Sequence, residues 1–521
     1  MSKYSIIPKL SKLEPQDGYF TLTADTVVLA TGSAIALATH FCQVVAPATG
    51  FSLEVNPTRP GEKNPVIEFK LDPSMTELGL EGYWLKITPE RITAQALQPN
   101  GLFYAIQTLR QLLPFQIFEL ARVSGVEWVI PCAEIEDKPR FAWRGAMLDV
   151  CRHFMPKTFV LKFIDLLALH KMNTFHWHLT EDQGWRIEIK KYPRLTEVGA
   201  WRKETLVGHL HDDRENLEFD GKVHGGFYTQ KEVRDVVEYA RARFVNVVPE
   251  IEMPGHAQAA IAAYPELGNI SQKLDVRTMW GISENVFNVE ESTFQFLQNV
   301  LDEVLELFPS TFIHVGGDEV PKIQWEQSPA AQARLKELGL KDEDQLQSYF
   351  IRRMDSFLNS RNRRLVGWDE ILEGGLAANA TVMSWRGEQG GIMAANSGHD
   401  VVMAPNDYTY LDYYQSENIE KEPLAIGGFV SLERVYEYNP LSAHISGENA
   451  RHILGVQAQL WTEYMPTPAQ VEYMAYPRLC ALSEVAWSPQ ESRYYGEFLQ
   501  RLTDHLARLR VRGVNYRPLD V

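Results

Sequence analysis

The sequence predicts an α/β fold, a (β/α)8 TIM barrel preceded by a small α+β domain. Two observations predict it. After residue 139, short apolar runs alternate with amphipathic helical stretches, and eight of these runs have the character of buried strands. The segment before them follows a different pattern, in which apolar and polar residues alternate. We therefore expect the small domain at residues 1–138 and the barrel, with a C-terminal helix, at residues 139–521.

The predicted small domain combines half-buried strands with one helix. Tyr19-Phe-Thr-Leu-Thr and Tyr83-Trp-Leu-Lys-Ile-Thr alternate as strands with one buried face do. A turn is expected at Gln98-Pro-Asn-Gly101, before a helix over residues 102–113 in which leucine and isoleucine recur at helical spacing. The polar segment Glu134-Ile-Glu-Asp-Lys-Pro139 ends in a proline, which marks a plausible domain boundary.

The predicted barrel rests on eight strands with helices between several of them. The strands are Trp143–Asp149, Thr174–His178, Asn246–Glu252, Phe312–Gly316, Arg364–Trp368, Thr381–Trp385, Val401–Ala404 and Leu454–Trp461. The clearest helical stretches are Lys157–His170, Glu232–Arg243, Thr293–Phe308, Gln345–Asn359 and Ala469–Trp487. Uneven spacing between the strands predicts several long loops.

Composition and charge describe an ordinary globular protein with an acidic balance. Hydrophobic residues make up 45% and charged residues 23% of the 521 residues, so a large core can form without disulfides or metals. The 51 lysines and arginines are outnumbered by 68 aspartates and glutamates, which gives a net charge of −17. This charge argues against nucleic acid or an anionic membrane as the main partner. No apolar run approaches the ~20 residues of a membrane span.

The cysteines and the first residues carry no strong signal. Met1-Ser-Lys-Tyr-Ser-Ile-Ile-Pro8 has neither an apolar h-region nor a small-residue cleavage site. We therefore expect a cytoplasmic protein, or a periplasmic or secreted one whose leader was removed. No cofactor or metal is expected, and the oligomeric state, monomer or homodimer, stays open. Four scattered cysteines form neither a disulfide framework nor a zinc pattern and are expected as buried or free thiols: Cys42, Cys132, Cys151 and Cys480.

Polar and aromatic side chains follow nearly every predicted strand at its C-terminal end. In a barrel of this class the active site lies at that face, so these side chains would meet at one mouth. Polar residues are common in any loop, but tryptophan is not, and three tryptophans stand at strand ends. The side chains are Asp149 and Arg152; His178, Glu181 and Asp182; Glu250, Glu252 and His256; His314, Asp318 and Glu319; Trp368 and Asp369; Trp385 and Arg386; Asp407, Tyr410 and Asp412; Trp461 and Glu463.

Two adjacent carboxylates stand out in the segment Ile313-His-Val-Gly-Gly-Asp-Glu-Val320. The glycines allow a tight turn at the strand end. Neighbours in an extended chain point to opposite sides, so Asp318 and Glu319 are not expected to flank one bond as an acid and a nucleophile. They suit a division of labour, in which one protonates a leaving oxygen and the other holds a group of the substrate.

Aromatic residues at the same mouth indicate a sugar site. The rings of Trp368, Trp385, Trp461 and Tyr410 could stack on the C–H face of a sugar. Each tryptophan alone could equally belong to the core. Arg152 with a carboxylate partner could give charge-assisted hydrogen bonds to sugar hydroxyls. Together with the carboxylates, these residues favour a carbohydrate-processing enzyme.

The chain resembles glycoside hydrolase family 20, the β-N-acetylhexosaminidases, over roughly residues 80 to 490. The combination of motifs, in this order, is specific for the family, whose architecture is a small α/β domain followed by a (β/α)8 barrel. The motifs are Trp143-Arg-Gly-Ala-Met-Leu-Asp149, Arg152-His-Phe, Phe175-His-Trp-His-Leu-Thr-Glu-Asp-Gln-Gly-Trp-Arg186, Glu252-Met-Pro-Gly-His256, His314-Val-Gly-Gly-Asp-Glu319 and Gln459-Leu-Trp-Thr-Glu463.

The resemblance implies an exo-acting enzyme that hydrolyses terminal β-linked GlcNAc or GalNAc with retention. Glu319 would be the general acid and then the base for water. Asp318 would hold the N–H of the 2-acetamido group, whose oxygen attacks the anomeric carbon, so the nucleophile belongs to the substrate. Tyr410 would hydrogen-bond the acetamido oxygen. We expect the environment to keep Glu319 protonated and Asp318 ionised, with a bell-shaped pH profile that has a mildly acidic to neutral optimum.

The resemblance also implies binding roles. Arg152 and Glu463 would bind the O3 and O4 side of the terminal sugar, and Asp412 would lie near O6 and O4. His256 would hydrogen-bond the acid or a neighbour rather than do chemistry. Glu181 stands where the family commonly has Asp, and it could serve the sugar hydroxyls or orient its neighbours. The walls of the pocket would be Trp368, Trp385 and Trp461.

Three alternatives stay open. His176-x-His178 puts two imidazoles on one face of a strand, which could be a metal site with His256, His314 and Asp318 in a metal-dependent hydrolase. The same motif fits histidines hydrogen-bonded inside the barrel. A sugar-binding protein with a dead site, and an enzyme that releases a disaccharide as a lacto-N-biosidase does, are the other two. The natural glycan, the linkage and the preference for GlcNAc or GalNAc are not predicted.

Overall fold

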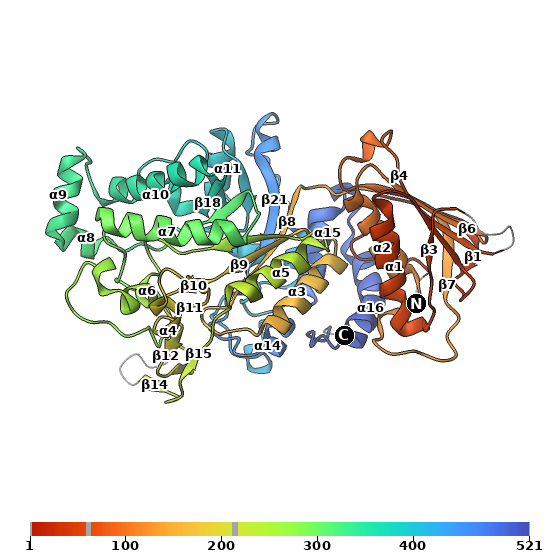
Figure 1. Cartoon of the computed structure of the whole chain (residues 1–521), viewed down its shortest axis with the longest axis horizontal. Helices are drawn as coiled ribbons and strands as arrows, with labels where there is room; N and C mark the ends of the chain where they lie inside the picture. The colour runs from red at the N-terminus through yellow and green to blue at the C-terminus, as the bar shows by residue number, and fades with distance from the viewer. Residues whose placement is uncertain (1–2, 59–63, 211–216, 520–521) are drawn as a thin grey trace.

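The computed structural model describes residues 3–58, 64–210 and 217–519. A mixed sheet with two helices lies at one end of the molecule and a closed barrel with surrounding helices at the other (Figure 1). The predicted fold class, a TIM barrel preceded by a small α+β domain, is confirmed. The C-terminal helix lies between the sheet and the barrel (Figure 1).

The N-terminal sheet has seven strands in the order β1-β7-β5-β6-β4-β2-β3. Helices α1 (Ala34–Thr49) and α2 (Pro99–Leu112) pack against each other and against β4. The segment Gln98–Gly101, predicted as a turn, instead begins α2, because Pro99 stands at the helix start, where an N–H has no partner anyway. The strands are β1 (Lys12–Thr21), β2 (Val27–Ala30), β3 (Val55–Asn56), β4 (Val66–Leu71), β5 (Tyr83–Ile87), β6 (Arg91–Ala96) and β7 (Val129–Asp137).

Eight parallel strands close the barrel in the order β16-β17-β18-β19-β20-β21-β8-β9. All eight predicted strands are present. Several end earlier than predicted, because their last residues already belong to the loops of the barrel mouth. The strands are β8 (Trp143–Asp149), β9 (Thr174–His178), β16 (Asn246–Glu250), β17 (Phe312–His314), β18 (Arg364–Trp368), β19 (Thr381–Ser384), β20 (Val401–Met403) and β21 (Ile453–Ala458).

Helices and short hairpins fill the connections between barrel strands. The predicted stretch Ala469–Trp487 is two helices rather than one, because Pro477 lacks an N–H and the residue before a proline is disfavoured in helical conformation. Among the described residues, no helix is both long and apolar enough to cross a membrane. The helices are α3 (Lys157–Leu169), α4 (Arg194–Glu197), α5 (Gln230–Arg241), α6 (Gln258–Ala263), α7 (Glu291–Leu307), α8 (Ile323–Gln327), α9 (Pro329–Glu337), α10 (Glu343–Ser360), α11 (Gln389–Asn396), α12 (Asn406–Thr409), α13 (Leu432–Glu437), α14 (Pro468–Ala475), α15 (Arg478–Trp487) and α16 (Tyr495–Val511). The short strands are β10 (Thr180–Glu181), β11 (Gly184–Trp185), β12 (Trp201–Arg202), β13 (Leu206–Val207), β14 (Glu218–Phe219) and β15 (His224–Gly225).

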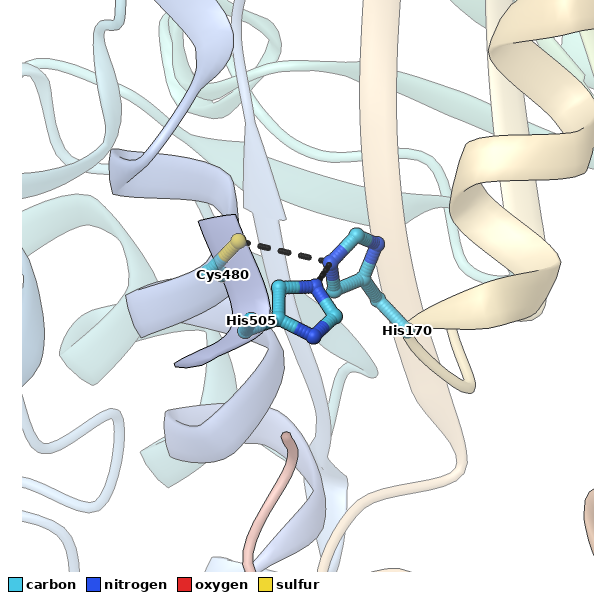
Figure 2. A group of neighbouring side chains, drawn as sticks. All are labelled: His170, Cys480 and His505. Carbon is cyan, nitrogen blue, oxygen red and sulfur yellow. Dashed lines mark hydrogen bonds between the residues drawn. The ribbon is translucent and has the colours of Figure 1, made fainter. Parts of the chain in front are cut away.

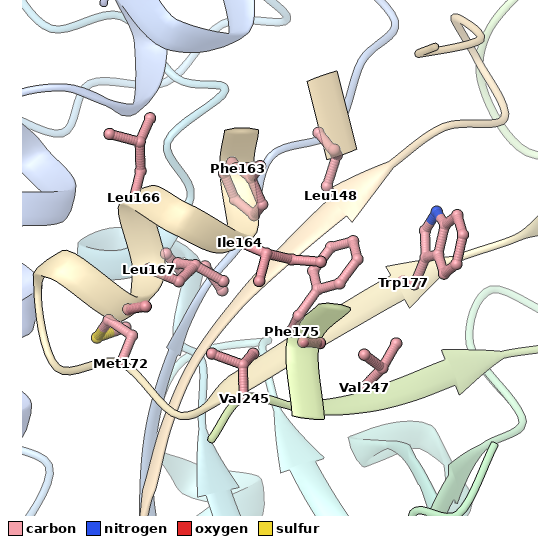
Figure 3. Close-up of a cluster of buried hydrophobic side chains, with 14 of the residues drawn as sticks. Leu148, Phe163, Ile164, Leu166, Leu167, Met172, Phe175, Trp177, Val245 and Val247 are labelled. Carbon is pink, nitrogen blue, oxygen red and sulfur yellow. The ribbon is translucent and has the colours of Figure 1, made fainter. Parts of the chain in front are cut away.

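In strand β9, one set of alternating side chains packs in the hydrophobic core and the other set points into the barrel. Side chains alternate along a strand, so Phe175 and Trp177 point outward into the apolar layer around the barrel, where Phe175 lies under α3 (Figure 3). The ring of Phe163 on α3 lies 5.7 Å from that of Phe175. The intervening His176 and His178 point into the barrel, where they contact a buried carboxylate described below. Five residues thus supply both the packing of α3 and the floor of the mouth.

Buried ion pairs join the two domains. Arg144 Nη2 of β8 lies 2.8 Å from Glu81 Oε1 of the N-terminal domain. Lys171 Nζ lies 2.7 Å from Asp137 Oδ2, and neither side chain is exposed to solvent. Trp487 Nε1 donates to the other oxygen of Asp137. Because removing one partner of such a pair costs about 3–5 kcal/mol, these contacts hold the two domains as one unit.

A buried cluster of His170, Cys480 and His505 pins α3 to α15 and α16 (Figure 2). His170 Nδ1 lies 2.7 Å from the Leu166 carbonyl, and His170 Nε2 lies 2.9 Å from His505 Nε2 and 3.3 Å from Cys480 Sγ. His505 Nδ1 faces the Arg508 guanidinium at 3.3 Å and must accept from it. A metal on His505 Nε2 would require a proton on Nδ1 against that guanidinium, so the cluster does not fit a metal site. All four cysteines are buried free thiols, as predicted.

Candidate active site

The C-terminal ends of the barrel strands surround a cavity of about 250 Å³. Seven of the eight barrel strands, or the loops after them, supply a lining residue, and the exception is β9. The cavity therefore gathers residues that are scattered over some 300 positions of sequence. Ten of the predicted site residues line it: Arg152, His256, Asp318, Glu319, Trp368, Trp385, Tyr410, Asp412, Trp461 and Glu463.

Glu181 is the predicted binding residue that does not line the cavity. Its side chain is buried behind the wall, where Oε2 lies 2.9 Å from Arg152 Nη2 and Oε1 lies 2.7 Å from His256 Nδ1. His178 Nε2 lies 3.3 Å from Oε2. Both oxygens are thus engaged by protein groups, and Glu181 orients two cavity residues rather than contacting a sugar.

The loop after β17 brings both predicted catalytic carboxylates to the cavity. Gly316 and Gly317 have φ angles of 68° and 91°, a backbone conformation that residues with a side chain rarely adopt. A Cβ on Gly316 would also lie 1.7 Å from Glu252 Oε2. Glu319 itself has φ of 46°, and strained backbone of this kind is typical of functional sites. The two glycines therefore allow a turn that residues with a side chain would adopt only with strain.

Asp318 and Glu319 converge on one imidazole. His256 Nε2 lies 3.5 Å from Asp318 Oδ2 and 3.5 Å from Glu319 Oε2. The expectation that the two side chains point to opposite sides was wrong, because the loop is not extended at Glu319. His256 lies between these carboxylates and Glu181, and it contacts Glu319, the residue that the sequence predicts as the general acid.

The charges around His256 set the pKa values of the pair. Although burial opposes the charge, Glu181 and Asp318 raise the pKa of His256 well above its usual value, so the imidazole is a cation. Burial, only partly offset by that cation, raises the pKa of Asp318 to about 6. Burial acts on Glu319 in the same direction, but contact with the His256 cation brings its pKa below the usual value. The two pKa values differ, as predicted, but in the opposite order. The His256 cation outweighs burial at Glu319, whereas burial outweighs the cation at Asp318.

Aromatic rings form the walls of the cavity. The rings of Trp385 and Tyr410 are stacked, with centroids 6.0 Å apart and planes 22° apart. Trp368 and Trp461 lie 5.7 Å apart on the neighbouring wall. Trp385 Nε1 donates to Glu370 Oε2 at 2.9 Å, which fixes the indole plane. These apolar faces suit the C–H face of a pyranose.

Polar side chains line the same cavity beside the aromatic rings. Arg152 lies over the Trp461 ring at 5.0 Å, and its Nε is 4.0 Å from Glu463 Oε1. Asp412 Oδ1 is buried with no hydrogen-bond partner among the described residues. Burial and the neighbouring Glu463 raise the pKa of Asp412 well above its usual value. Unsatisfied carboxyl and guanidinium groups at a cavity wall are suited to binding sugar hydroxyls.

The histidines that allowed a metal site surround Glu250 in the barrel core. His178 Nδ1 lies 2.6 Å and His176 Nε2 lies 3.0 Å from Glu250 Oε2. His314 Nδ1 lies 2.8 Å from Glu250 Oε1, which also accepts from Trp368 Nε1 at 2.9 Å. The His-x-His motif therefore matches its other interpretation, histidines hydrogen-bonded inside the barrel, and these contacts support Trp368 from below.

Sequence reasoning missed four residues of the cavity wall: Gly281, Ile282, Tyr413 and Ile426. Ile282 and Ile426 come from long loops whose path the strand pattern does not predict. Tyr413 follows Asp412 directly and could have been found by its place after β20. The supporting role of Glu370 was also missed, although it stands two residues beyond Trp368.

Two protein-family models match this chain, one in each domain. The catalytic domain of glycosyl hydrolase family 20 matches residues 141–490, and domain 2 of the same family matches residues 3–138. The likeness thus extends to the N-terminal domain, beyond the range in which the motifs lie.

Individual proteins give the same result. A β-hexosaminidase of Porphyromonas gingivalis is 48% identical over 84% of this chain, which spans about half (54%) of that protein's length. A β-hexosaminidase of Vibrio furnissii is 38% identical over 92% of this chain and 76% of its own. Among solved structures, the β-N-acetylhexosaminidase of Streptomyces coelicolor has a TM-score of 0.86 with 30% identity, over 100% of this chain and 98% of its own. An exo-β-N-acetylglucosaminidase of Vibrio harveyi, solved with N-acetylglucosamine, has a TM-score of 0.85 with 34% identity, over 99% and 79%.

Proposed function

Since this chain belongs to glycosyl hydrolase family 20, we propose that it is an exo-acting β-N-acetylhexosaminidase. It removes terminal non-reducing β-linked GlcNAc or GalNAc from a glycan with retention of configuration. The observation that carries the proposal is the convergence of Asp318 and Glu319 on His256 inside a cavity walled by Trp368, Trp385 and other aromatic rings. One residue can protonate the leaving oxygen there while its neighbour holds the acetamido group.

The first step transfers a proton and opens the glycosidic bond. Glu319 gives its proton to the glycosidic oxygen, and the acetamido carbonyl oxygen attacks the anomeric carbon as the bond to the aglycone breaks. Asp318, ionised, accepts a hydrogen bond from the acetamido N–H and stabilises the positive charge of the oxazolinium ring that forms. Tyr410 lines the same cavity and holds the acetamido oxygen in place.

The second step reverses the roles. The Glu319 carboxylate takes a proton from water, the hydroxide oxygen bonds to the anomeric carbon, and the ring opens to restore the acetamido group. Two displacements at the same carbon retain its configuration. Arg152, Asp412 and Glu463 line the cavity and bind the hydroxyls of the terminal sugar, and recognition of these hydroxyls favours exo action.

The reactive form holds one proton on the carboxyl pair. It needs Glu319 protonated and Asp318 ionised, whereas in the free site the pKa of Asp318 is the higher of the two. An acetamido N–H placed on Asp318 favours its ionised form. Exclusion of water by the sugar favours the neutral form of Glu319. Substrate binding therefore shifts the proton toward the residue that uses it.

Hydrolysis of a chromogenic β-N-acetylglucosaminide and the matching β-glucoside, each with EDTA, tests the proposal. Rapid cleavage of the first and almost none of the second is expected, because the glucoside lacks the internal nucleophile. Equal cleavage would contradict the roles of Asp318 and Tyr410. Loss of activity with EDTA would favour the metal-dependent hydrolase, and absence of cleavage of either glycoside would favour a binding protein or an enzyme that releases a disaccharide.

A further inference from the structure

A second cavity, of about 220 Å³, lies at the seam between the N-terminal domain and the barrel. Helices α1 and α2 and the segment Phe115–Phe118 form one side of it. The last turn of α3, together with Arg243 and Arg512, forms the other. That turn of α3 precedes β9 and Arg243 precedes β16, so this cavity lies at the N-terminal ends of the strands. It is therefore at the end of the barrel opposite the mouth that holds Asp318.

Three guanidinium groups surround this seam cavity: Arg110, Arg243 and Arg512. Asp165 serves two of them at once, with Oδ1 2.5 Å from Arg243 Nε and Oδ2 3.2 Å from Arg512 Nη2. The other acid of the lining, Glu119, forms no salt bridge with these arginines among the ion pairs of the described residues. One carboxylate thus compensates two arginines and leaves the third without an acidic partner.

Arg110 is the arginine without such a partner. Its contacts are a hydrogen bond from Nη1 to Gln107 Oε1 at 3.1 Å and the face of the Phe118 ring 4.7 Å away. Its Nε is closed off from solvent and has no hydrogen-bond partner in the described part of the chain. Burial and the nearby Arg512 lower the pKa of Arg110 to about 10, so it remains charged at neutral pH. His40 on the same wall is neutral, since burial and Arg110 lower its pKa to about 4.

Arg110 is half-buried, and its closed-off Nε lacks an acceptor among the described residues, whereas buried donors in proteins normally have one. A guanidinium presents several N–H donors in one plane, which matches the oxygens of phosphate better than a single-point donor would. The volume is several times the ~30 Å³ that one water takes up in the liquid, so a tetrahedral oxyanion fits with water beside it. Positive charge, open N–H donors and suitable size coincide here.

We propose that the seam cavity binds a small phosphate-class oxyanion on Arg110, with Arg243 and Arg512 adding positive charge beside it. The anion could be inorganic phosphate or the phosphate group of a small sugar ester. Bound there, it joins α2 of the N-terminal domain to the barrel end of α3 and stabilises the seam. Because the active site lies at the other end of the barrel, the anion is expected to raise stability and leave turnover unchanged.

Thermal unfolding in phosphate against sodium chloride of equal ionic strength tests the proposal. The melting temperature of the wild type is expected to rise with phosphate in a saturable way, by about 1–2 °C at ten times the dissociation constant. Glucose 6-phosphate is the second probe. A midpoint at least tenfold lower than that of phosphate would identify the ester as the ligand, and equal midpoints would identify free phosphate. Either result supports the site.

Three variants locate the effect. Arg110→Gln is expected to lose the saturable response, and Arg361→Gln, on an exposed arginine paired with Asp302, keeps it. Leu120→Glu places a negative charge on the exposed rim of the cavity without disturbing the core and is expected to weaken phosphate binding at least threefold. An unsaturable rise, or the same saturable rise in wild type, Arg110→Gln and Leu120→Glu, would overturn the proposal.

Discussion

Replacing Glu181 by glutamine is expected to slow hydrolysis although Glu181 does not line the cavity. Its carboxylate holds His256 Nδ1 at 2.7 Å and Arg152 Nη2 at 2.9 Å. Glutamine keeps the shape of the side chain but removes its charge. His256 then loses the main cause of its raised pKa, so that pKa falls, and Arg152 loses its closest carboxylate.

The size of the effect follows from these two contacts. A hydrogen bond to a charged group contributes about 1.5–3 kcal/mol, so weakening two of them removes ~3–5 kcal/mol from the site. Part of this appears as lower stability of the fold. If about 3 kcal/mol is lost from the transition state, kcat/KM falls about a hundredfold. The loss is expected in both kcat and KM, because Glu181 contacts His256, which lies beside Glu319, and also Arg152, to which we assign sugar binding.

Steady-state kinetics of the chromogenic N-acetylglucosaminide over a range of pH is the assay. Glu188→Gln is the matched control, since Glu188 accepts from the Gln230 backbone and has no contact with His256. Because a His256 that is less often charged lowers the pKa values of Asp318 and Glu319 less, both values rise, and the alkaline limb of the profile moves to higher pH. A kcat/KM within threefold of wild type, with an unmoved limb, would refute this account of Glu181.

Three further predictions concern the carboxyl pair and the buried histidines. Glu319→Gln and Asp318→Asn should each lower kcat by about 10²–10⁴ with an unchanged melting temperature; normal turnover in either would remove that residue from the mechanism. The proposed mechanism uses the pair with one proton, and the higher pKa of the pair is about 6, so kcat/KM should fall as the pH rises through 6; a constant kcat/KM from pH 6 to 9 would argue against it. Burial lowers the pKa of His170 to about 4, below the ~6.5 of an unfolded chain, so its neutral form adds stability above pH 6.5 that is lost as the pH falls through 4. The loss is about 3 kcal/mol, and chemical denaturation at pH 7 and pH 4 should show a smaller difference in His170→Gln than in wild type.

The barrel could be predicted because the residue pattern of its strands shows which side chains are apolar and which are polar. In β9 the alternation of Phe175 and Trp177 with His176 and His178 defines a strand with one apolar and one polar face. The break at Pro477 was missed because the apolar pattern continues across it while the backbone cannot. Hydrophobic periodicity indicates which faces of an element are buried. It does not show that one proline, which lacks an N–H, ends a helix.

The site residues that lie close to the C-terminal end of a strand could be predicted from the sequence. Arg152, Glu319 and Trp461 follow strands directly and were found. Ile282 and Ile426 lie in loops far from any strand end, and only the folded chain brings them to the rim. Glu181 was placed correctly near the site but in the wrong layer, since a sequence does not tell which carboxylate faces the cavity and which faces another side chain.

The order of the two pKa values could not be predicted from sequence. It depends on a cation that Glu181 and Asp318 create on His256, and on the depth at which each carboxyl is buried. Both the charge on His256 and the burial of each carboxyl depend on which side chains meet in the folded protein. The same holds for the seam cavity, whose arginines stand some 400 positions apart in the chain.

The most direct test of substrate-assisted hydrolysis is the rate of cleavage along a series of aryl β-glucosaminides. The substrates carry acetamido, fluoroacetamido, difluoroacetamido and trifluoroacetamido groups on the same ring. Each fluorine withdraws electrons from the carbonyl oxygen, so if that oxygen attacks the anomeric carbon, kcat falls steeply along the series. A kcat that stays level would contradict the account, because it would mean that the nucleophile comes from the protein or from water.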